Sequence, residues 1–237
     1  LWLGPMNTFD SICHAFSTMS TGGFSNHNAS IHAWNSNYVK IILTIFMFLG
    51  GINFALLYQV LSGGLRGSWS NEPFRVYVMA IFVIYILFAG SLIITGAGNS
   101  FETLVIDPVF MIVSTMSSTG YTVSNFQNWG TFILLLVFVM MMFGACAGST
   151  SGGAKLDRAI YFIKNSHNEI YRILHPNTIR PVNINGRAVS PETVNKVSAF
   201  LGLYCLVILA GGLVLTTFRI PLVDSLFTSF SCVSNTG

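Results

Sequence analysis

The sequence predicts an all-α integral membrane protein built from repeated modules, each consisting of a helix, a re-entrant loop and a second helix. Three observations support this fold class. The 237 residues are 52% hydrophobic and only 8% charged, whereas soluble domains carry about 25% charged residues. Several apolar stretches approach or reach the roughly 20 residues that a helix needs to cross a bilayer. A block of 14 residues also recurs three times along the chain.

The apolar stretches give the predicted spans. They lie at 38–61, 74–95, 129–143 and 197–218. At least three of them are expected to cross the membrane fully, whereas 129–143 is short by itself. The chain is therefore expected to pass through the membrane several times.

Basic residues concentrate on one side of the predicted membrane. If the spans alternate in direction, the loops 62–73 and 155–196 share a side. Together with the boundary residue Arg75, these loops hold nine of the eleven Lys and Arg residues, and the other two are Lys40 and Arg219. The positive-inside rule assigns the basic side to the cytoplasm. The net charge of +3 thus reflects membrane topology, and no nucleic-acid partner is expected.

The recurring block begins with Asp and ends with Gly. Its three copies align without a gap and read DSICHAFSTMSTGG from Asp10, DPVFMIVSTMSSTG from Asp107 and DSLFTSFSCVSNTG from Asp224. Each Asp is predicted to cap the N-terminus of a short pore helix, and Pro108 suits the first helical position. About ten helical residues follow, too few to span a bilayer, so each block predicts a re-entrant helix.

The end of each block predicts one wall of a cation-selective pore. The closing Ser, Thr, Asn and Gly residues disfavour further helix, and non-helical backbone at membrane depth survives only where protein buries it or water reaches it. Rings of backbone carbonyls can replace the hydration shell of an ion, and glycine allows backbone angles closed to other residues. The short helices aim their negative C-terminal ends at the same place, which favours a cation over an anion.

A second feature predicts a gate. After Phe143 the chain reads GACAGSTSGGAK, in which each glycine disfavours helix by about 1 kcal/mol relative to Ala and the Ser and Thr residues compete for backbone hydrogen bonds. Close packing of helices through small residues is the alternative, but consecutive small residues remove the surface that would pack. The sequence therefore predicts a loop in the water-filled cavity beneath the carbonyl rings, which form the predicted selectivity filter. In that position the loop can obstruct ions. The predicted gating-loop residues are Gly144, Gly148, Ser149, Thr150, Ser151, Gly152, Gly153 and Lys155.

These motifs resemble the Trk/Ktr/HKT superfamily of potassium transporters, and within it the bacterial membrane pore subunits of the Trk type. The resemblance rests on STMSTGGFSNHNASI, STMSSTGYTVSNFQNWG, GACAGSTSGGAK and the terminal SNTG, which occur in the family's order and cover essentially the whole chain. It implies a channel-like potassium uptake pore with pseudo-fourfold symmetry in a multi-pass protein of the bacterial inner membrane. Three filters cannot close a fourfold ring, so an upstream module and a final helix are expected outside this sequence.

The resemblance also implies the site residues. One filter strand comes from each repeat, and potassium binds at the filter carbonyls of Gly23, Gly120 and Gly237. The implied filter residues are Ser20, Thr21, Gly22, Gly23, Ser117, Ser118, Thr119, Gly120, Ser234, Asn235, Thr236 and Gly237. Potassium is the transported ion, and no covalent cofactor is expected.

The chain divides into four parts on this reading. Residues 1–62 would hold the second-repeat pore helix, filter and inner helix, and 63–165 the whole third repeat with its broken inner helix. Residues 166–196 would form a cytoplasmic connection, and 197–237 the fourth-repeat outer helix, pore helix and filter start. The resemblance implies three partners besides potassium: membrane lipid, a second copy in a homodimer, and a cytosolic ring of nucleotide-binding regulatory subunits.

Two other functional classes fit part of the sequence. A secondary carrier coupled to sodium or protons is the alternative, but carriers show inverted repeats and intramembrane charges, whereas these repeats run in parallel and the acids are expected at caps. A nucleotide-hydrolysing enzyme is suggested by GSTSGGAKL at 148–156. That segment fails the phosphate-loop pattern, since Ala154 stands where Lys is required and Leu156 where Ser or Thr is required. The protein is therefore not expected to be an enzyme.

Overall fold

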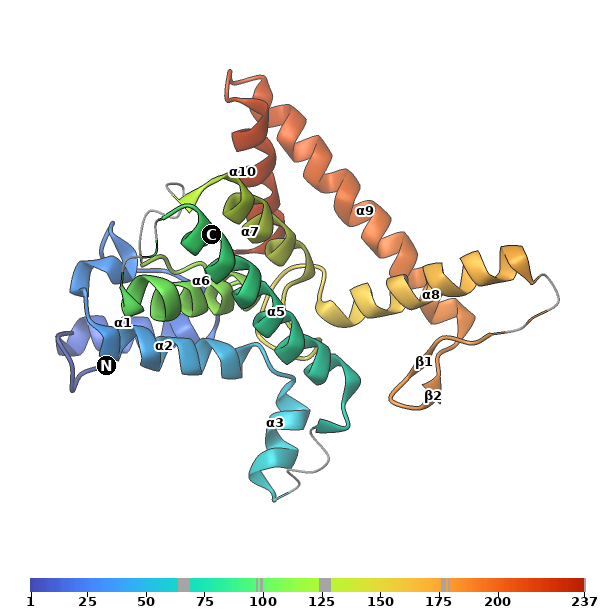
Figure 1. Cartoon of the computed structure of the whole chain (residues 1–237), viewed down its shortest axis with the longest axis horizontal. Coiled ribbons are helices and arrows are strands. Elements are labelled where there is room, and N and C mark those ends of the chain that lie inside the picture. The colour runs from blue at the N-terminus through green and yellow to red at the C-terminus, as the bar shows by residue number, and fades with distance from the viewer. Residues whose placement is uncertain are drawn as a thin grey trace.

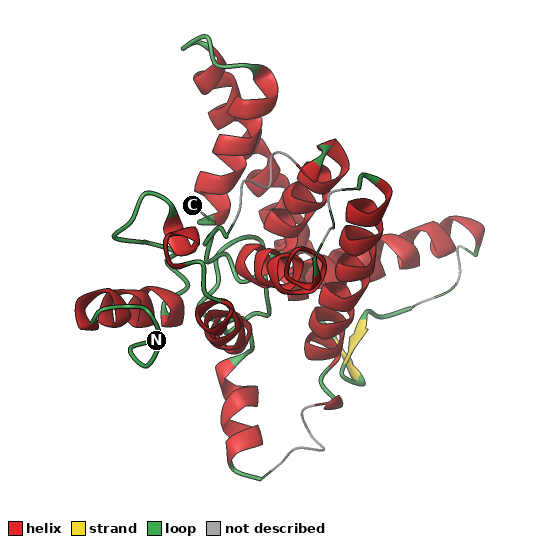
Figure 2. Cartoon of the chain, turned by 60° about the vertical axis from the view of Figure 1, so that its left-hand side comes forward, coloured by secondary structure: helices red, strands yellow, loops and turns green. Residues whose placement is uncertain are grey.

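A computed structural model describes residues 1–63, 69–96, 98, 100–123, 129–175, 178 and 180–236, and these are mainly helical (Figures 1 and 2). The α-helices are α1 (Thr8–Met19), α2 (Asn37–Gly50), α3 (Phe54–Leu61), α5 (Glu72–Ile94), α6 (Asp107–Met116), α7 (Thr131–Phe143), α8 (Leu156–Leu174), α9 (Pro191–Thr216) and α10 (Leu222–Ser234). Shorter elements are the 3-10 helix Ser30–Trp34, the π-helical turn Glu102–Ile106 and an antiparallel hairpin of β1 (Asn183–Ile184) and β2 (Arg187–Ala188).

Within the described part of the chain, two helices are each long and apolar enough to cross a membrane. They are α5, with 23 residues, and α9, with 26. Both begin at clear start signals, because Asn71 accepts a hydrogen bond from the Phe74 N–H and Ser190 accepts one from the Thr193 N–H, as N-cap residues do. A proline in the first turn of each helix, where its missing N–H costs nothing, reinforces the start.

The span predicted for 38–61 is interrupted. Helices α2 and α3 meet at an angle of 107° across a short break, and only together are they long and apolar enough to cross a membrane. The prediction of at least three full spans therefore holds only if this pair counts as one. The break falls at Gly50 and Gly51, where two consecutive glycines weaken the helix, and Asn53 then caps α3. The expectation that 129–143 forms only a short helix is confirmed by α7.

Helix α6 lies at the centre of the fold. Nearly all of its residues are buried, with Ile112 and Met116 packed in one apolar cluster with α5 and α7, and Phe110 and Val113 in another with α2. In Figure 1 it lies between the α1–α2 pair on one side and α7 with α10 on the other. The short helix predicted for the second block is therefore present, and its re-entrant position in a membrane stays a prediction.

The acidic residues of the three blocks are not N-caps. Helix α1 begins earlier than predicted, with Asn7 as its cap accepting from the Asp10 N–H at 2.7 Å. Asp107 directly continues a π-helical turn, and its carboxylate accepts from Lys40 instead of from the helix. Helix α10 begins at Leu222, which leaves Asp224 exposed in the first turn. All three acids nevertheless lie in the first turn of their helices, where a negative charge interacts favourably with the helix dipole.

Candidate functional site

The three short helices end in the same backbone motif. One residue at the end of each helix has a left-handed conformation, with φ of 51° at Thr21, 55° at Ser118 and 56° at Asn235. These residues occupy the same position of the recurring block. The next N–H in each copy reaches back to a helix carbonyl: Gly22 to Ser17 (2.8 Å), Thr119 to Ser114 (2.8 Å) and Thr236 to Ser231 (3.0 Å). This is the Schellman ending of a helix, and here it is repeated in three blocks in register.

The hydroxyl contacts repeat in two of the three copies. The Ser117 and Thr119 hydroxyls lie 2.7 Å apart, and those of Ser234 and Thr236 lie 2.8 Å apart. In the first block Gly22 stands at the corresponding position, so the Ser20 hydroxyl donates only to the Ser17 carbonyl, at 3.3 Å. The first strand is therefore chemically different from the other two.

The first two blocks approach each other at their closing glycines. Gly23 and Gly120 both have positive φ, 68° and 80°. A Cβ atom at Gly23 would stand 1.6 Å from the Thr119 carbonyl oxygen, so only glycine lets these strands lie side by side. Gly237, the predicted third member of this set, lies outside the described residues.

Residues after these glycines bind the two strands together. The Tyr121 hydroxyl donates to the Phe24 carbonyl at 3.3 Å, and the Tyr121 carbonyl accepts from the Ser114 hydroxyl at 2.9 Å. His14 is fully buried and stacks on Tyr121, with its Nε2 atom 3.0 Å from the Ser25 hydroxyl. The contacts of Tyr121 were not predicted, and the Tyr after SSTG is the sequence signal that could have indicated this residue.

The helix break predicted after Phe143 is confirmed. Helix α7 ends there, α8 begins at Leu156, and the residues 144–155 between them are non-helical. Three of their glycines have positive φ. Figure 2 shows loop segments converging between the helices in the middle of the structure. A Cβ atom at Gly152 would stand 2.3 Å from the Ser234 carbonyl oxygen, so the predicted gating loop directly touches the end of the third block.

Charged residues hold this loop in a compact form. The Lys155 ammonium donates to the carbonyls of Ser149, at 3.4 Å, and Ser151. The Ala147 N–H donates to Asp157 Oδ1 at 2.8 Å. Burial raises the pKa of the Asp157 carboxyl, and the Ala147 hydrogen bond acts in the opposite direction. The loop is thus an ordered structure and not a loose linker.

The loop is also joined to the break between α2 and α3. The Cys146 N–H donates to the Gly51 carbonyl at 3.2 Å, and the Phe54 N–H donates to the Gly148 carbonyl at 3.0 Å. The Asn53 Nδ2 atom donates to the Ala147 carbonyl at 2.7 Å. Sequence reasoning missed this contact, although Gly-Gly-Ile-Asn within an apolar stretch was an available signal.

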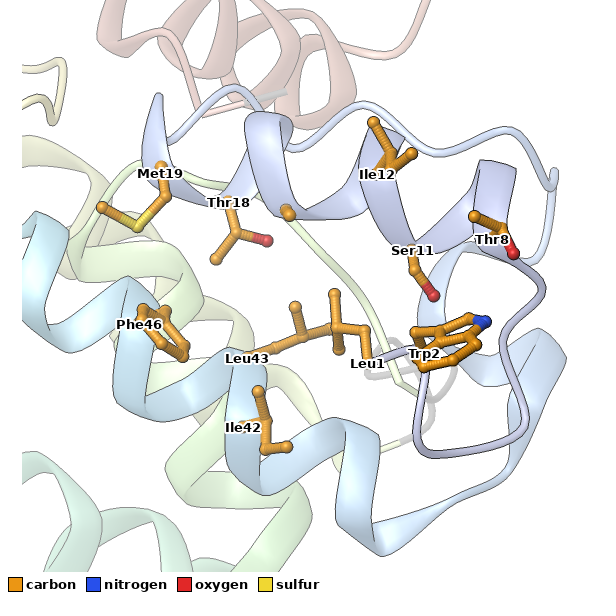
Figure 3. Close-up of a pocket in the computed structure, with 11 residues that line it drawn as sticks. Leu1, Trp2, Thr8, Ser11, Ile12, Thr18, Met19, Ile42, Leu43 and Phe46 are labelled. Carbon is orange, nitrogen blue, oxygen red and sulfur yellow. The ribbon is translucent and has the colours of Figure 1, made fainter.

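An apolar pocket of about 320 Å³ lies elsewhere, between α1 and α2. Figure 3 shows Ile12 and Met19 of α1 and Phe46 of α2 around it. Its polar lining consists of the hydroxyl residues Thr8, Ser11 and Thr18, and no residue of the second or third block lines it. Among the described residues no group of three or more His, Cys, Asp or Glu could hold a metal ion, and the four cysteines are free.

Known proteins resemble the chain throughout its length. The family model described as "TrkH: Cation transport protein" matches residues 3–237. The chain is 29% identical over its whole length to the Trk system potassium uptake protein TrkH of Escherichia coli, of which it covers 49%. It is also 29% identical over 99% of its length to TrkG of that organism, covering 48% of it.

A solved structure has the same fold. The crystal structure of the potassium transporter TrkH from Vibrio parahaemolyticus matches 100% of this chain with a TM-score of 0.92 and 28% identity, and 51% of that protein is covered. The chain thus spans about half the length of these relatives. Because the family model matches nearly every residue, the chain belongs to the TrkH family of cation transport proteins.

Proposed function

We propose that the protein takes up potassium across the bacterial inner membrane through a pore lined by the strands that follow α1, α6 and α10. The repeated Schellman endings carry this proposal. They give three helix C-termini and the residues that follow them the same local backbone conformation. Helix C-termini and carbonyl rings favour cations. The relatives are described as potassium uptake proteins or a potassium transporter, and this supports potassium as the ion.

The filter proposal can be tested at Gly120. Gly120→Ser is expected to lower the preference for potassium over sodium while the full-length protein stays folded and inserted. Rubidium and sodium uptake in potassium-transport-deficient cells measures the effect. Gly186→Ser is a matched control, since Gly186 has a similar φ of 75° but lies in a hairpin turn with open space around it. If both variants keep normal selectivity at normal expression, the glycines only permit turns and the filter assignment fails.

We further propose that residues 144–155 form a gate, hereafter the gating loop. Its contact with the third block at Ser234 supports a position next to the ion path. Its glycines give it the conformational freedom that a moving element needs. Non-helical backbone at membrane depth must be buried in protein or lie against water, and the gating loop combines buried residues such as Ser151 with partly exposed ones such as Thr150.

A coupled carrier is less well supported. Such carriers use intramembrane charges to bind their cargo. The buried charges at α2 and α6 belong to Lys40 and Asp107, which pair with each other, and Lys40 also pairs with the partly exposed Glu102 of the π-helical turn. Their pairing with one another supports a structural role, although Asp107 is not the helix cap that the sequence predicted. Strict stoichiometric coupling to sodium or protons in transport assays would favour the carrier instead.

The partners of the membrane subunit are proposals as well. We infer a homodimer and a cytosolic ring of nucleotide-binding regulatory subunits that binds near α8. This helix carries exposed apolar residues, Ile170, Ile173 and Leu174, beside the exposed Arg172. Cross-linking from Arg172 or Arg187 to a co-purified soluble subunit is the expected result. Failure of any such subunit to co-purify would indicate that this face is covered by the protein's own packing.

A further inference from the structure

The gating loop lies in the break between α2 and α3, and we propose that Asn53 is the positioning residue that ties it to α3. This role presupposes the gate proposed above and adds the element to which the gate is attached. Through this contact, the position of α3 would determine the position of the gating loop. Three independent contacts carry it.

The first is backbone pairing between two interrupted helices. A helix break leaves carbonyls unpaired at the end of one helix and N–H groups at the start of the next. Here the Gly50 and Gly51 carbonyls accept from the Thr150 and Cys146 N–H groups, at 3.3 and 3.2 Å, and the Gly148 carbonyl accepts from the α3 N-terminus. Each break therefore supplies hydrogen-bond partners for the unpaired backbone groups of the other. In lipid an unpaired backbone group costs several kcal/mol, so the loop leaves the break only where water replaces these bonds.

The second contact is the Asn53 side chain, which serves both segments at once. Its Oδ1 atom caps α3 by accepting from the Ala55 and Leu56 N–H groups, at 2.8 and 3.3 Å. Its Nδ2 atom donates to the Ala147 carbonyl at 2.7 Å. The Ala147 N–H is held from the other side by Asp157. Residue Ala147 of the gating loop is thus held between α3 and α8 through its carbonyl and its N–H.

The third contact is steric. A Cβ atom at Gly148 would stand 2.6 Å from Asn53 Nδ2, and Gly148 has φ of 77°. Any side chain at this position would displace the Asn53 carboxamide, which two helix N–H groups and one carbonyl hold in place. The glycine that the sequence suggested for loop flexibility is therefore also required by close contact with Asn53.

Helix α3 is well placed to transmit movement. It bends 107° away from α2 and projects away from the other helices in Figure 1. Leu56 packs one face of α3 into the apolar cluster, whereas Tyr58 and Leu61 on its other side are 73% and 79% exposed, so among the described residues packing restrains only part of this helix. A shift of α3 would move the Asn53 carboxamide and with it the Ala147 peptide.

Asn53→Asp tests this in the full-length protein. Aspartate keeps an acceptor for the α3 cap and is an equally good N-cap, but it places an oxygen where the Nδ2 donor faced the Ala147 carbonyl. Cys146, within the loop and 2% exposed, reports loop opening through its reaction with a membrane-impermeant maleimide in inside-out vesicles. We expect labelling to rise about tenfold, the factor for one lost buried hydrogen bond, and rubidium flux to rise with it at unchanged selectivity.

Asn71→Asp is the matched control, because Asn71 caps α5 in the same way through the Phe74 N–H. It should change neither labelling nor flux. Peptide mapping separates Cys146 from the other cysteines. If Asn53→Asp fails to fold, Asn53→Ser keeps a hydroxyl cap but is too short to reach Ala147, and the same rise is expected.

The outcomes separate this role from the gate itself. Unchanged Cys146 labelling in a folded Asn53 variant overturns the positioning role, even where shortening the loop raises flux. Increased labelling without increased flux supports the attachment of the loop to Asn53 and contradicts the gate.

Discussion

The Lys40 ammonium lies 2.7 Å from Asp107 Oδ1 and so joins α2 to the start of α6. It also lies 2.6 Å from Glu102 Oε1. The Lys40 side chain is 3% exposed and the Asp107 side chain 9% exposed. Because α6 continues into the Ser117–Gly120 strand, this ion pair fixes one end of the helix whose other end enters the proposed filter.

We expect Lys40→Met to destabilise the protein by about 3 to 5 kcal/mol, because removing Lys40 leaves the buried Asp107 carboxylate without compensation. The loss should appear as a lower unfolding temperature of the full-length protein in detergent. The triple variant with Glu102→Gln and Asp107→Asn should recover part of it, since no uncompensated charge then remains.

Lys196→Met is the control for this effect. Lys196 pairs with Glu192 on the surface, and both side chains are more than 70% exposed. Exposed pairs of this kind contribute about 0.5 kcal/mol or less. Equal destabilisation by the two lysine variants would contradict a structural role for the buried pair.

We expect Gly23→Ala to disrupt uptake and ion preference. The new Cβ atom would meet the Thr119 carbonyl oxygen at 1.6 Å, and the φ of 68° is unfavourable for alanine. The two strands must separate to relieve this clash. This costs more than ordinary overpacking, which costs about 1 to 3 kcal/mol. Competition between rubidium and sodium in uptake assays measures the result.

The neighbouring Gly22→Ala is the comparison for that variant. Its Cβ atom would first meet the exposed Phe24 side chain and the Ser20 hydroxyl, both at 3.3 Å, and these can move by the small amount needed. Selectivity close to that of the unchanged protein is expected. A loss of selectivity equal to that of Gly23→Ala would mean that the whole segment, and not the contact with Thr119, determines ion preference.

Sequence periodicity predicted the repeated features and missed those that depend on distant partners. The three blocks could be aligned because each must end a helix and start a strand within the same number of residues, and Thr21, Ser118 and Asn235 adopt the same left-handed turn. Lys40 was expected on the opposite face from the basic loops. Its carboxylate partners lie 62 and 67 residues away, and no local pattern indicates them.

The break in 38–61 was missed for a different reason. Apolar side chains continue on both sides of Gly50 and Gly51, so hydropathy alone predicts one span. The groups that stabilise the break, such as the Gly148 carbonyl and the Cys146 N–H, come from the gating loop. The glycine pair by itself only weakens the helix. It becomes a break because the second broken helix lies against it and supplies hydrogen-bond partners.

The last prediction concerns the length of the gating loop. The Ala145 carbonyl accepts from the Leu156 N–H at 2.9 Å, which closes the base of the loop and should allow the chain to fold without residues 148–153. Their removal takes away the segment that reaches Ser234, so we expect rubidium flux to rise. Potassium preference over sodium should stay unchanged, because the strand residues that follow α1 and α6 keep all their contacts with each other.

Gly152→Ala separates obstruction from support of the filter. It keeps the loop at full length but places a Cβ atom 2.3 Å from the Ser234 carbonyl oxygen, so it should disturb the third strand without opening the path. Single-channel or rubidium-flux recordings compare the two variants after a check of folding by size-exclusion chromatography. Unchanged or abolished flux in the folded deletion variant contradicts the gate. A shift in selectivity there, matching that of Gly152→Ala, would instead make the loop a support of the third filter strand, since a Cβ atom at Gly152 would lie against Ser234 and Asn235.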